Sequence, residues 1–509
     1  MNGSQPACET QPAPASDTGG HRSFYGQILR HSSIYGIGVM VQKMGSIVML
    51  PIYTRYLSPS DYGLIELLDL SVTVLGMIFG AQFSAALFYH YFKAETPKAR
   101  GTVVTTTLIG SAVLGALGGG LGILLAGRVS VLVFHTPAYA AYLRILFLQF
   151  IFSLPLESCF CWLRTINRAD LFVLLSICRL VLSAALNTIF LVGFRLAVTG
   201  FLTGSLIATA VLAVAMVFLC LHRTSLAFDF ILLQRLFRYS LALSIAGAAL
   251  FIMNFADRFF LQRFTTLADI GLYSLAYRIA MLISYLHSSF HTYWSAQMYD
   301  LAQRKAYAMY FSRVFTYLFL TLSTASVVIS LCSGIALHIL ATPAFFAARR
   351  LVPILLLAYF LRAVGDYFRC VLYIENQPGR DAQLNWLGAG LCLLGYAVLI
   401  PGLKVWGAAV ATVLAFALVA VVGFIWARRL QPFVLEWRRL AAISSAAGVA
   451  IYGHFLLPAA ALGEEVVATA LLVCVYIGLL VLLLPAHAEE KALLKSIPRF
   501  VAGLCWRPR

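Results

Sequence analysis

Long apolar segments recur along the whole chain, and only short polar connections separate them. A helix needs about 20 mostly apolar residues to cross the hydrocarbon core of a bilayer, and about fourteen segments meet this requirement. They are centred near residues 44, 77, 114, 152, 182, 210, 250, 282, 323, 362, 393, 416, 448 and 475. The pattern therefore predicts an all-α, polytopic membrane protein with no soluble domain between its spans.

Composition agrees with many membrane crossings. Of the 509 residues, 61% are hydrophobic and only 11% are charged, whereas soluble domains carry about 25% charged residues. The mean hydropathy is +0.88. Most of the ten cysteines lie in apolar stretches, where a free thiol packs as a small hydrophobe. We therefore expect no disulfide framework.

Basic residues determine the predicted orientation. Lys and Arg total 37 against 20 Asp and Glu, and short cytoplasmic loops collect Lys and Arg. With the N-terminus inside, about 24 basic residues fall on the cytoplasmic side and about 8 outside, so both termini are expected in the cytoplasm. Because no basic run is interleaved with base-stacking aromatics on a soluble domain, nucleic acid is not an expected partner.

One stretch of the chain occurs twice. The segment PIYTRYLSPSDYGLIEL (51–67) matches FFLQRFTTLADIGLYSL (259–275), each position 208 residues later. The shared positions include Arg55 with Arg263, Asp61 with Asp269, Gly63 with Gly271 and Leu64 with Leu272. Weaker anchors at similar offsets are Asn167 with Asn376 and Gly200 with Gly407.

The repeated stretch predicts a helix end, a turn and a new helix. Ser58 and Thr266 suit the N-cap position, and Asp61 and Asp269 follow three residues later. Helices 1–6 would then correspond to helices 7–12. Because six spans is an even number, both halves point the same way, which predicts a parallel repeat about the membrane normal. Such a repeat is compatible with two lobes around a central cleft, and the alternative is a duplicated helix bundle without a cleft.

These features predict the following organisation. Residues 1–23 form a disordered cytoplasmic tail, 24–223 the N-lobe, 224–240 an amphipathic linker at the cytoplasmic surface, 241–430 the C-lobe, 431–486 helices 13 and 14, and 487–509 a basic cytoplasmic tail. In the linker, apolar residues recur at helical spacing beside arginines, as in helices that lie in the membrane interface.

Three segments carry a family resemblance: YGIGVMVQKMGSIVMLPIYTRYLSPSDYGLIELL, NFADRFFLQRFTTLADIGLYSLAYRIA and GLKVWGAAVATVLA. They resemble the O-antigen (lipopolysaccharide) and polysaccharide flippases, a branch of the multidrug/oligosaccharidyl-lipid/polysaccharide exporter superfamily. The resemblance spans about residues 24–430. It implies two lobes around a central cavity in the bacterial cytoplasmic (inner) membrane. It also implies that a polyprenyl-diphosphate-linked oligosaccharide is flipped to the outer leaflet, with the polymerase and glycosyltransferases of the same pathway as candidate partners.

Charged residues inside predicted spans are the candidate site residues, because such charges are costly and usually face a cavity or a partner. Ser176, Arg179, Ser183 and Asn187 form one stripe, and Tyr359, Arg362, Asp366, Arg369 and Tyr373 form another. We expect Lys43, Arg179, Arg278, Arg362 and Arg369, with Asp366 beside them, to hold the diphosphate through charge-assisted hydrogen bonds, and Tyr277 and Tyr359 to contact sugar.

Other intramembrane charges have more than one reading. Glu66 and Asp69 suit ion or proton sites, or else they lie at a solvated helix start. Asp257 and Arg258 suit ion coupling, or else they organise the end of a helix. Arg362 and Asp366 also suit a structural i,i+4 pair. His287 and His291 are four residues apart, but no further ligand is evident. We therefore expect no metal site.

Catalytic and cofactor motifs do not stand out. We find no Walker A motif, no GxSxG with partners and no paired carboxylates on a hydrophilic loop, so neither an enzyme nor a cofactor is expected. The leading hypothesis is a lipid-linked oligosaccharide flippase. The alternatives are a multidrug or small-molecule exporter of the same superfamily, a membrane glycosyltransferase or polymerase, and a scaffold for envelope-synthesis proteins.

The orientation gives the first testable prediction. Single cysteines placed at Ser4 and Arg507, in a variant that lacks the native cysteines, should react with a membrane-impermeant maleimide only after intact cells are permeabilised. Labelling of either site in unpermeabilised cells would show that the topology is inverted or that a span is miscounted.

Overall fold

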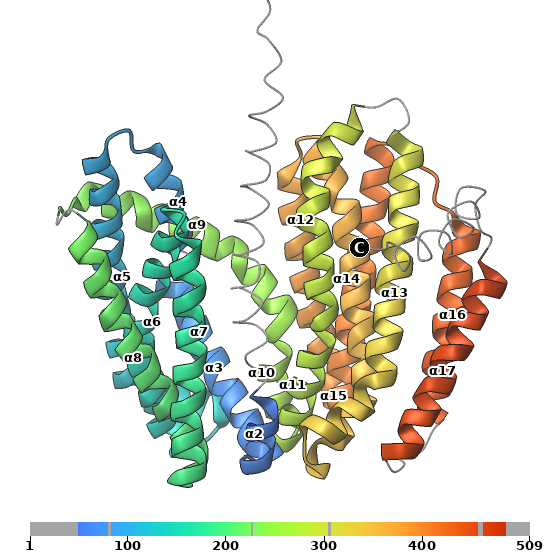
Figure 1. The fold of residues 1–509 in the computed structure, drawn as a ribbon, viewed down its shortest axis with the longest axis horizontal. Helices are drawn as coiled ribbons and strands as arrows, with labels where there is room; N and C mark the ends of the chain where they lie inside the picture. Colours follow the sequence, from blue (N-terminus) through green and yellow to red (C-terminus); the bar gives the residue numbers. More distant parts are fainter. Residues whose placement is uncertain (1–48, 80–82, 225–226, 304–306, 457–461, 485–509) are drawn as a thin grey trace, which may run out of the picture.

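The computed structural model describes residues 49–79, 83–224, 227–303, 307–456 and 462–484. Every regular element in this part of the chain is helical (Figure 1). The helices are α2 (Leu50–Tyr56), α3 (Pro59–Phe79), α4 (Phe83–Lys93), α5 (Pro97–Phe134), α6 (Ala140–Thr165), α7 (Ala169–Thr188), α8 (Ala197–Arg223), α9 (Phe230–Phe255), α10 (Asp257–Phe264), α11 (Leu267–Ala280), α12 (Leu282–Ala302), α13 (Tyr307–Leu340), α14 (Val352–Ile374), α15 (Pro378–Leu430), α16 (Trp437–Leu456) and α17 (Leu462–Leu483). Three short elements are η1 (Pro137–Tyr139), η2 (Ile189–Gly193) and η3 (Pro343–Arg350).

The prediction of an all-helical polytopic membrane protein is confirmed. Among the described residues, ten helical segments are long and apolar enough to cross a membrane, or eleven when the bent pair of η3 and α14 is one span. The expected span near residue 44 lies largely outside the described residues, and α16 is a 20-residue helix that is not among those segments. The 53-residue α15 holds two expected spans, because its backbone breaks at Lys404 (φ 51°, ψ −128°) and the chain folds back, so that Tyr396 Oη lies 3.1 Å from Thr412 Oγ1.

The helices form two bundles, which we name the N-lobe (α2–α8) and the C-lobe (α10–α15) (Figure 1). The lobes meet at the lower end of Figure 1, where the two repeated turns lie, and diverge at the upper end. We call the lower end the repeat end. We call the upper end the basic end, because the helix ends and connections there hold Lys93, Lys98, Arg164, Arg168 and Arg428. The two copies of the repeated stretch, one from each lobe, therefore lie where the lobes meet.

Close backbone contact between α3 and α11 joins the lobes. A Cβ atom on Gly63 would lie 2.0 Å from the Leu267 carbonyl oxygen, and one on Gly271 would lie 2.0 Å from the Pro59 carbonyl oxygen. The two contacts are equivalent under the 208-residue offset, so the interface is self-complementary, as a two-fold axis requires. Small residues allow such an approach between helices in lipid.

Local geometry repeats as well. Ser58 Oγ accepts from the Asp61 N–H at 3.2 Å, and Thr266 Oγ1 accepts from the Asp269 N–H at 3.2 Å. Both carboxylates bond back to the N-cap residue, so the predicted capping motif is present twice. Asn167 and Asn376 both adopt positive φ, 55° and 52°, after the corresponding helices end.

The predicted linker is not a separate helix. Residues 230–240 are the first part of α9, which continues without a break to Phe255. Along its length α9 packs on α3, α4 and α5 of the N-lobe and on α15 of the C-lobe, and Figure 1 shows it passing from one bundle to the other. It therefore connects the lobes as a single rigid element.

A buried carboxylate attaches α17 to the C-lobe. Glu465, in the first turn of α17, is 3% exposed and lies 2.9 Å from both His338 Nδ1 and Arg349 Nη1. A Cβ atom on Gly334 would lie 1.6 Å from Glu465 Oε1, so glycine leaves room for the carboxylate. Removing one partner from such a buried pair is strongly destabilising.

The glycine contact predicts a matched pair of stability losses. Gly63→Ala and Gly271→Ala should each destabilise the purified protein by about 1–3 kcal/mol, because each added methyl group overlaps the opposite backbone. The double variant should lose less than the sum, since one separation of the helices relieves both clashes. Thermal unfolding in detergent measures this effect.

Gly390→Ala is the control, because a Cβ there meets no atom within 4 Å. If Gly63→Ala unfolds at the same temperature as Gly390→Ala, the two repeated turns are not in contact in the populated state.

Candidate functional site

A polar cavity of about 300 Å³ lies in the N-lobe and is bordered by one cation from the C-lobe. Residues of α2, α3, α6, α7 and α8 line it, and Arg278 of α11 completes the wall. Its polar lining residues are Tyr53, Glu66, Asp69, Gln149, Ser183, Asn187, Ser205 and Arg278. The cavity therefore combines carboxylates, amides, hydroxyls and one guanidinium.

Glu66 and Arg278 form an ion pair between the lobes. Arg278 Nη2 donates to Glu66 Oε2 at 2.9 Å, and the side chains are 34% and 12% exposed. The guanidinium also lies over the Tyr62 ring, 5.0 Å from its centroid. Because Arg278 keeps a third of its side-chain surface accessible beside the cavity, its remaining N–H groups are available to an anionic ligand.

A neutral polar cluster forms another part of the cavity wall. Asn187 Nδ2 donates to Tyr53 Oη at 3.1 Å and to Ser205 Oγ at 3.2 Å. A Cβ atom on Gly204 would lie 2.4 Å from Asn187 Oδ1, so glycine at this position lets α8 approach the amide closely. The cluster fixes the orientation of a side chain that is only 1% exposed.

Two further acceptors in the cavity lack partners among the described residues. Gln149 Oε1 is buried, and no donor among the described residues reaches it. Asp69 is exposed to the cavity, and its carboxylate forms no ion pair or hydrogen bond with the described part of the chain. A buried unpaired acceptor is costly, so the site favours a ligand that supplies donors.

Beside this cavity, hydrogen bonds tie the end of the first helix to the C-lobe. Thr54 Oγ1 donates to the Leu340 carbonyl at 2.9 Å, and Thr342 Oγ1 donates to the Thr54 carbonyl at 3.2 Å. Tyr62 meets the edge of Phe345 with ring centroids 6.0 Å apart. Together with the glycine contact, these interactions close the repeat end.

Arg179 lies outside the cavity, one helical turn from Ser183. It donates to Glu157 Oε1 at 2.8 Å, and the two side chains are 32% and 51% exposed. The ion pair joins α7 to α6, so Arg179 has a partner that its sequence neighbourhood does not reveal. Lys43 lies outside the described residues.

The charged stripe of α14 forms its own network. Arg369 lies 3.0 Å from Asp366 and 2.5 Å from Asp381, which also accepts from Tyr373 at 2.8 Å. Arg362 donates to Asn254 Oδ1 of α9 and is 4.0 Å from Asp366. His287 Nδ1 is also 4.0 Å from Asp366. These groups are mutually neutralised in the structure.

Asp257 and Arg258 are buried with each other. Arg258 Nη1 lies 2.7 Å from Asp257 Oδ1, and both residues are 1% exposed. The guanidinium lies 3.8 Å from the centroid of Tyr277, and Tyr277 meets Tyr359 edge to face at 5.3 Å. Tyr277 and Tyr359 are 1% and 3% exposed, so in this conformation they pack inside the C-lobe.

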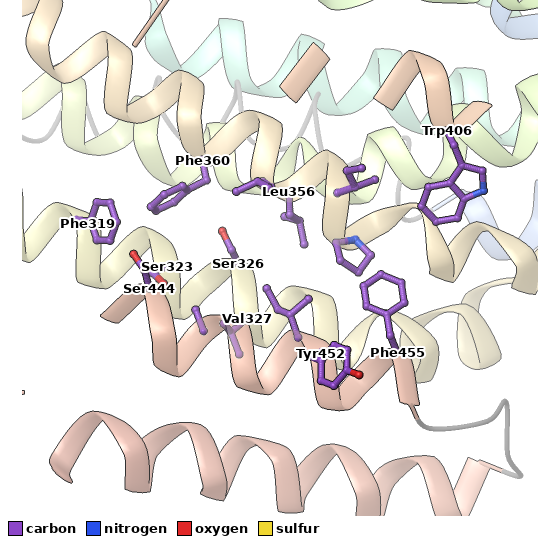
Figure 2. Close-up of a pocket in the computed structure, with 16 residues that line it drawn as sticks. Phe319, Ser323, Ser326, Val327, Leu356, Phe360, Trp406, Ser444, Tyr452 and Phe455 are labelled. Carbon is purple, nitrogen blue, oxygen red and sulfur yellow. The ribbon is translucent and has the colours of Figure 1, made fainter. Parts of the chain in front are cut away.

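A second cavity is apolar and lies at the outer side of the C-lobe (Figure 2). It has a volume of about 490 Å³ between α13, α14 and α16. Figure 2 shows its aromatic lining, which includes Phe319, Phe360, Tyr452 and Phe455. None of the described residues that line it is charged, so it suits a hydrocarbon chain rather than a headgroup.

Sequence reasoning missed several residues of the polar cavity. Tyr53, Gln149 and Ser205 were not among the candidates, because each is a single neutral polar residue in an apolar span. Ser183 and Asn187 of α7 belong to a polar stripe predicted from the sequence. Their helical spacing was the signal in the sequence that marked them as residues of one helix face. Within the described residues, no three His, Cys, Asp or Glu side chains form a metal-binding group.

Known proteins share the fold. A lipid II flippase, MurJ, in its inward closed conformation matches with a TM-score of 0.67 at 12% identity, covering 87% of this chain and 97% of that one. An inward-facing multidrug resistance MATE family transporter of the MOP superfamily matches at 0.60 and 16% identity, covering 79% and 96%. A MOP superfamily transporter from Pyrococcus furiosus matches at 0.52 and 16%, covering 82% and 96%. These likenesses establish the fold.

Sequence comparison adds the family. No curated protein matches the chain. The family model for polysaccharide biosynthesis proteins matches residues 28–293, which is just over half of the chain and includes both repeated turns and all the lining residues of the polar cavity. The chain therefore belongs to the polysaccharide biosynthesis protein family and has the fold of MOP-superfamily transporters.

Proposed function

We propose that the protein flips a polyprenyl-diphosphate-linked oligosaccharide from the cytoplasmic to the outer leaflet, for surface polysaccharide synthesis, by alternating access. The observation that carries this proposal is the placement of Arg278. This cation comes from one lobe and faces a polar cavity in the other. A transported anion bound there contacts both lobes, so its binding and the movement of the lobes are coupled.

The chemistry of Arg278 suits a diphosphate. A guanidinium binds phosphate oxygens through two parallel, charge-assisted hydrogen bonds. In the structure Glu66 occupies one side of that fork, so an incoming diphosphate competes with a carboxylate of the protein. This competition keeps binding modest, which release on the other side of the membrane requires.

The displaced carboxylate must then be neutralised. Glu66 leaves its only ion-pair partner among the described residues when the diphosphate arrives, and Asp69 already lacks one. A proton or a cation bound by Glu66 and Asp69 offsets the cost of unpaired charge inside the membrane. We retain these two carboxylates as the ion-coupling candidates. The Asp257–Arg258 pair is already neutralised, which favours its role in organising the end of α9.

In this proposal the remaining candidate residues contact the substrate in other conformations of the transport cycle. Arg362, Asp366 and Arg369 line up along α14, and Arg179 lies on α7. Lys43 lies outside the described residues and stays a candidate from the sequence. Because each described arginine of this group is bound to a carboxylate or an amide, contact with substrate requires exchange of partners as the lobes move. Tyr277 and Tyr359 contact sugar only in a conformation that exposes them.

The membrane orientation follows from charge. In this proposal the chain lies in the inner membrane with both termini cytoplasmic. The basic end then faces the cytoplasm under the positive-inside rule, and the closed repeat end faces outward. The apolar cavity beside α16 offers the polyprenyl chain a protein surface while its headgroup crosses. Membrane lipid and the polymerase and glycosyltransferases of the pathway are the proposed partners.

A multidrug or small-molecule exporter is the second candidate. The 490 Å³ apolar cavity favours it, since drug-sized ligands bind in mostly apolar pockets of about 300–1,000 Å³. The two functions differ at Arg278, because an exporter of neutral or cationic drugs has no need of a fixed cation at its inter-lobe cavity.

Replacement of Arg278 tests the flippase. Arg278→Ala should lower surface polysaccharide in a flippase-null strain by at least about tenfold, the loss expected when a hydrogen bond to a charged group worth about 1.5–3 kcal/mol is removed. Arg278→Lys should restore export only in part, because it keeps the charge but not the fork. Membrane abundance is measured alongside.

A charge swap separates binding from folding. Glu66→Arg combined with Arg278→Glu keeps an ion pair between the lobes but moves the cation to α3. We expect normal abundance with low export. Full export by the folded Arg278→Ala variant would contradict the proposed role of Arg278.

Closure of the repeat end gives a second test. Cysteines at Thr54 and Thr342, in a variant without native cysteines, should be joined by a short bifunctional maleimide, because Thr342 Oγ1 lies 3.2 Å from the Thr54 carbonyl. The cross-link should stop transport, since outward opening must separate these residues. Flux is measured in proteoliposomes.

Cysteines at Thr324 and Tyr476, whose hydroxyls are 2.9 Å apart, provide the control. This link joins α13 to α17 and leaves both lobes free to move, so transport should continue. Normal transport by protein cross-linked between Thr54 and Thr342 would exclude an outward opening at the repeat end.

A further inference from the structure

We infer that the polar N-lobe cavity is the binding site for one sugar ring, the one bonded directly to the diphosphate, and that Gln149 and Asn187 help to select that sugar. This inference rests on the proposed function, because it assumes that Arg278 holds the diphosphate. It assigns a sugar ring to the cavity, whereas the charged residues alone indicate only an anionic ligand.

Position is the first argument. Arg278 lies in the wall of the cavity that holds Gln149 and Asn187. A sugar on a diphosphate is separated from the phosphorus by a single bridging oxygen. When the diphosphate binds Arg278, the attached ring must therefore lie within a few atoms of the guanidinium, and the cavity is the polar space that Arg278 borders.

Lining chemistry is the second argument. A sugar ring presents hydroxyl groups that both donate and accept, together with apolar C–H faces. The cavity matches this pattern, with the amides of Gln149 and Asn187 and the carboxylate of Asp69 beside apolar side chains such as Leu146 and Phe201. A hydrocarbon or an aromatic drug would leave these polar groups without partners.

Unpaired acceptors are the third argument. Gln149 Oε1 is buried with no donor among the described residues, and the Asp69 carboxylate is also unpartnered there. Sugar hydroxyls supply donors to both groups. Sites that hydrogen-bond a substrate hydroxyl reject analogues that lack it, so these residues discriminate between sugars that differ at one hydroxyl.

Size and rigidity limit the cavity to one ring. Its volume of about 300 Å³ is at the lower end of the range of about 300–1,000 Å³ for small-molecule pockets. Asn187 is held by Tyr53 and Ser205, and α8 approaches its amide closely at Gly204. The rest of the oligosaccharide must extend away from this cavity.

Binding of two matched probes tests the inference. One is a short-chain prenyl diphosphate, and the other is the same molecule with one N-acetylhexosamine or hexose on the diphosphate. The full-length protein is held in nanodiscs of neutral lipid, and affinities are measured by calorimetry. For at least one sugar of a small panel, the wild-type protein should bind the sugar-bearing probe at least about tenfold more tightly than the bare one.

The variants separate sugar binding from phosphate binding. Gln149→Leu should lose the advantage conferred by the sugar yet bind the bare prenyl diphosphate as wild type does, whereas Arg278→Ala should weaken both probes. Asn187→Leu should resemble Gln149→Leu but also disturbs the Tyr53 contact, so Gln149→Leu is the decisive variant. Gln234→Leu, at an exposed position of α9, is the control and should match wild type with both probes.

The two proposals fail in different ways. Equal affinity of the wild type for bare and sugar-bearing probes, across the panel, would overturn the sugar site and leave the flippase proposal intact. So would a sugar advantage that survives in Gln149→Leu. If the wild-type protein binds neither probe, or if Arg278→Ala binds both probes as tightly as the wild type does, the proposed function and this inference are both overturned.

Discussion

The structure depends on one close approach of backbone to backbone, where Gly63 of α3 meets Gly271 of α11. Helices in lipid gain little from hydrophobic burial against each other, so contact depends on small residues that permit close packing. At this point a single methyl group on either helix would overlap a carbonyl oxygen of the other. The lobes touch because both copies of the repeated stretch carry glycine there.

That contact also places the charged groups of the site. Glu66 follows Gly63 by about one helical turn, and Arg278 follows Gly271 by about two turns, so each is on the helix face that approaches the partner lobe. The two side chains meet at 2.9 Å because the helices are already in contact at the repeat end. Separation of the glycines would separate the ion pair, which links the packing of the lobes to the chemistry of the cavity.

The other buried charges of the chain show why Arg278 is distinctive. Asp257 with Arg258 and Glu465 with Arg349 are buried pairs within or beside one lobe, and they hold elements together. Their charges are satisfied by neighbours that move with them. Arg278 instead takes its partner from the other lobe and keeps part of its surface beside a polar cavity, so a separation of the lobes would break its ion pair.

The sequence by itself determined the features that depend on local or periodic patterns. Apolar length predicts the spans because each must match the bilayer, and the caps at Ser58 and Thr266 follow from bonds within one turn. The repeat was also readable, since Gly63 and Gly271 occupy equivalent positions in matching stretches.

Only the tertiary structure decided which polar residues share a cavity. Arg179 and Arg278 look alike in sequence, but one is paired within its lobe to Glu157 and the other faces the opposite lobe. Tyr277 and Tyr359 lie on polar stripes yet pack inside the C-lobe, while Gln149, which no motif marks, faces the cavity. The physical reason is that spacing along a helix fixes only relative directions around its axis. Which direction faces a cavity is set by how each helix is rotated and where the two lobes meet, and that depends on packing between residues distant in the chain.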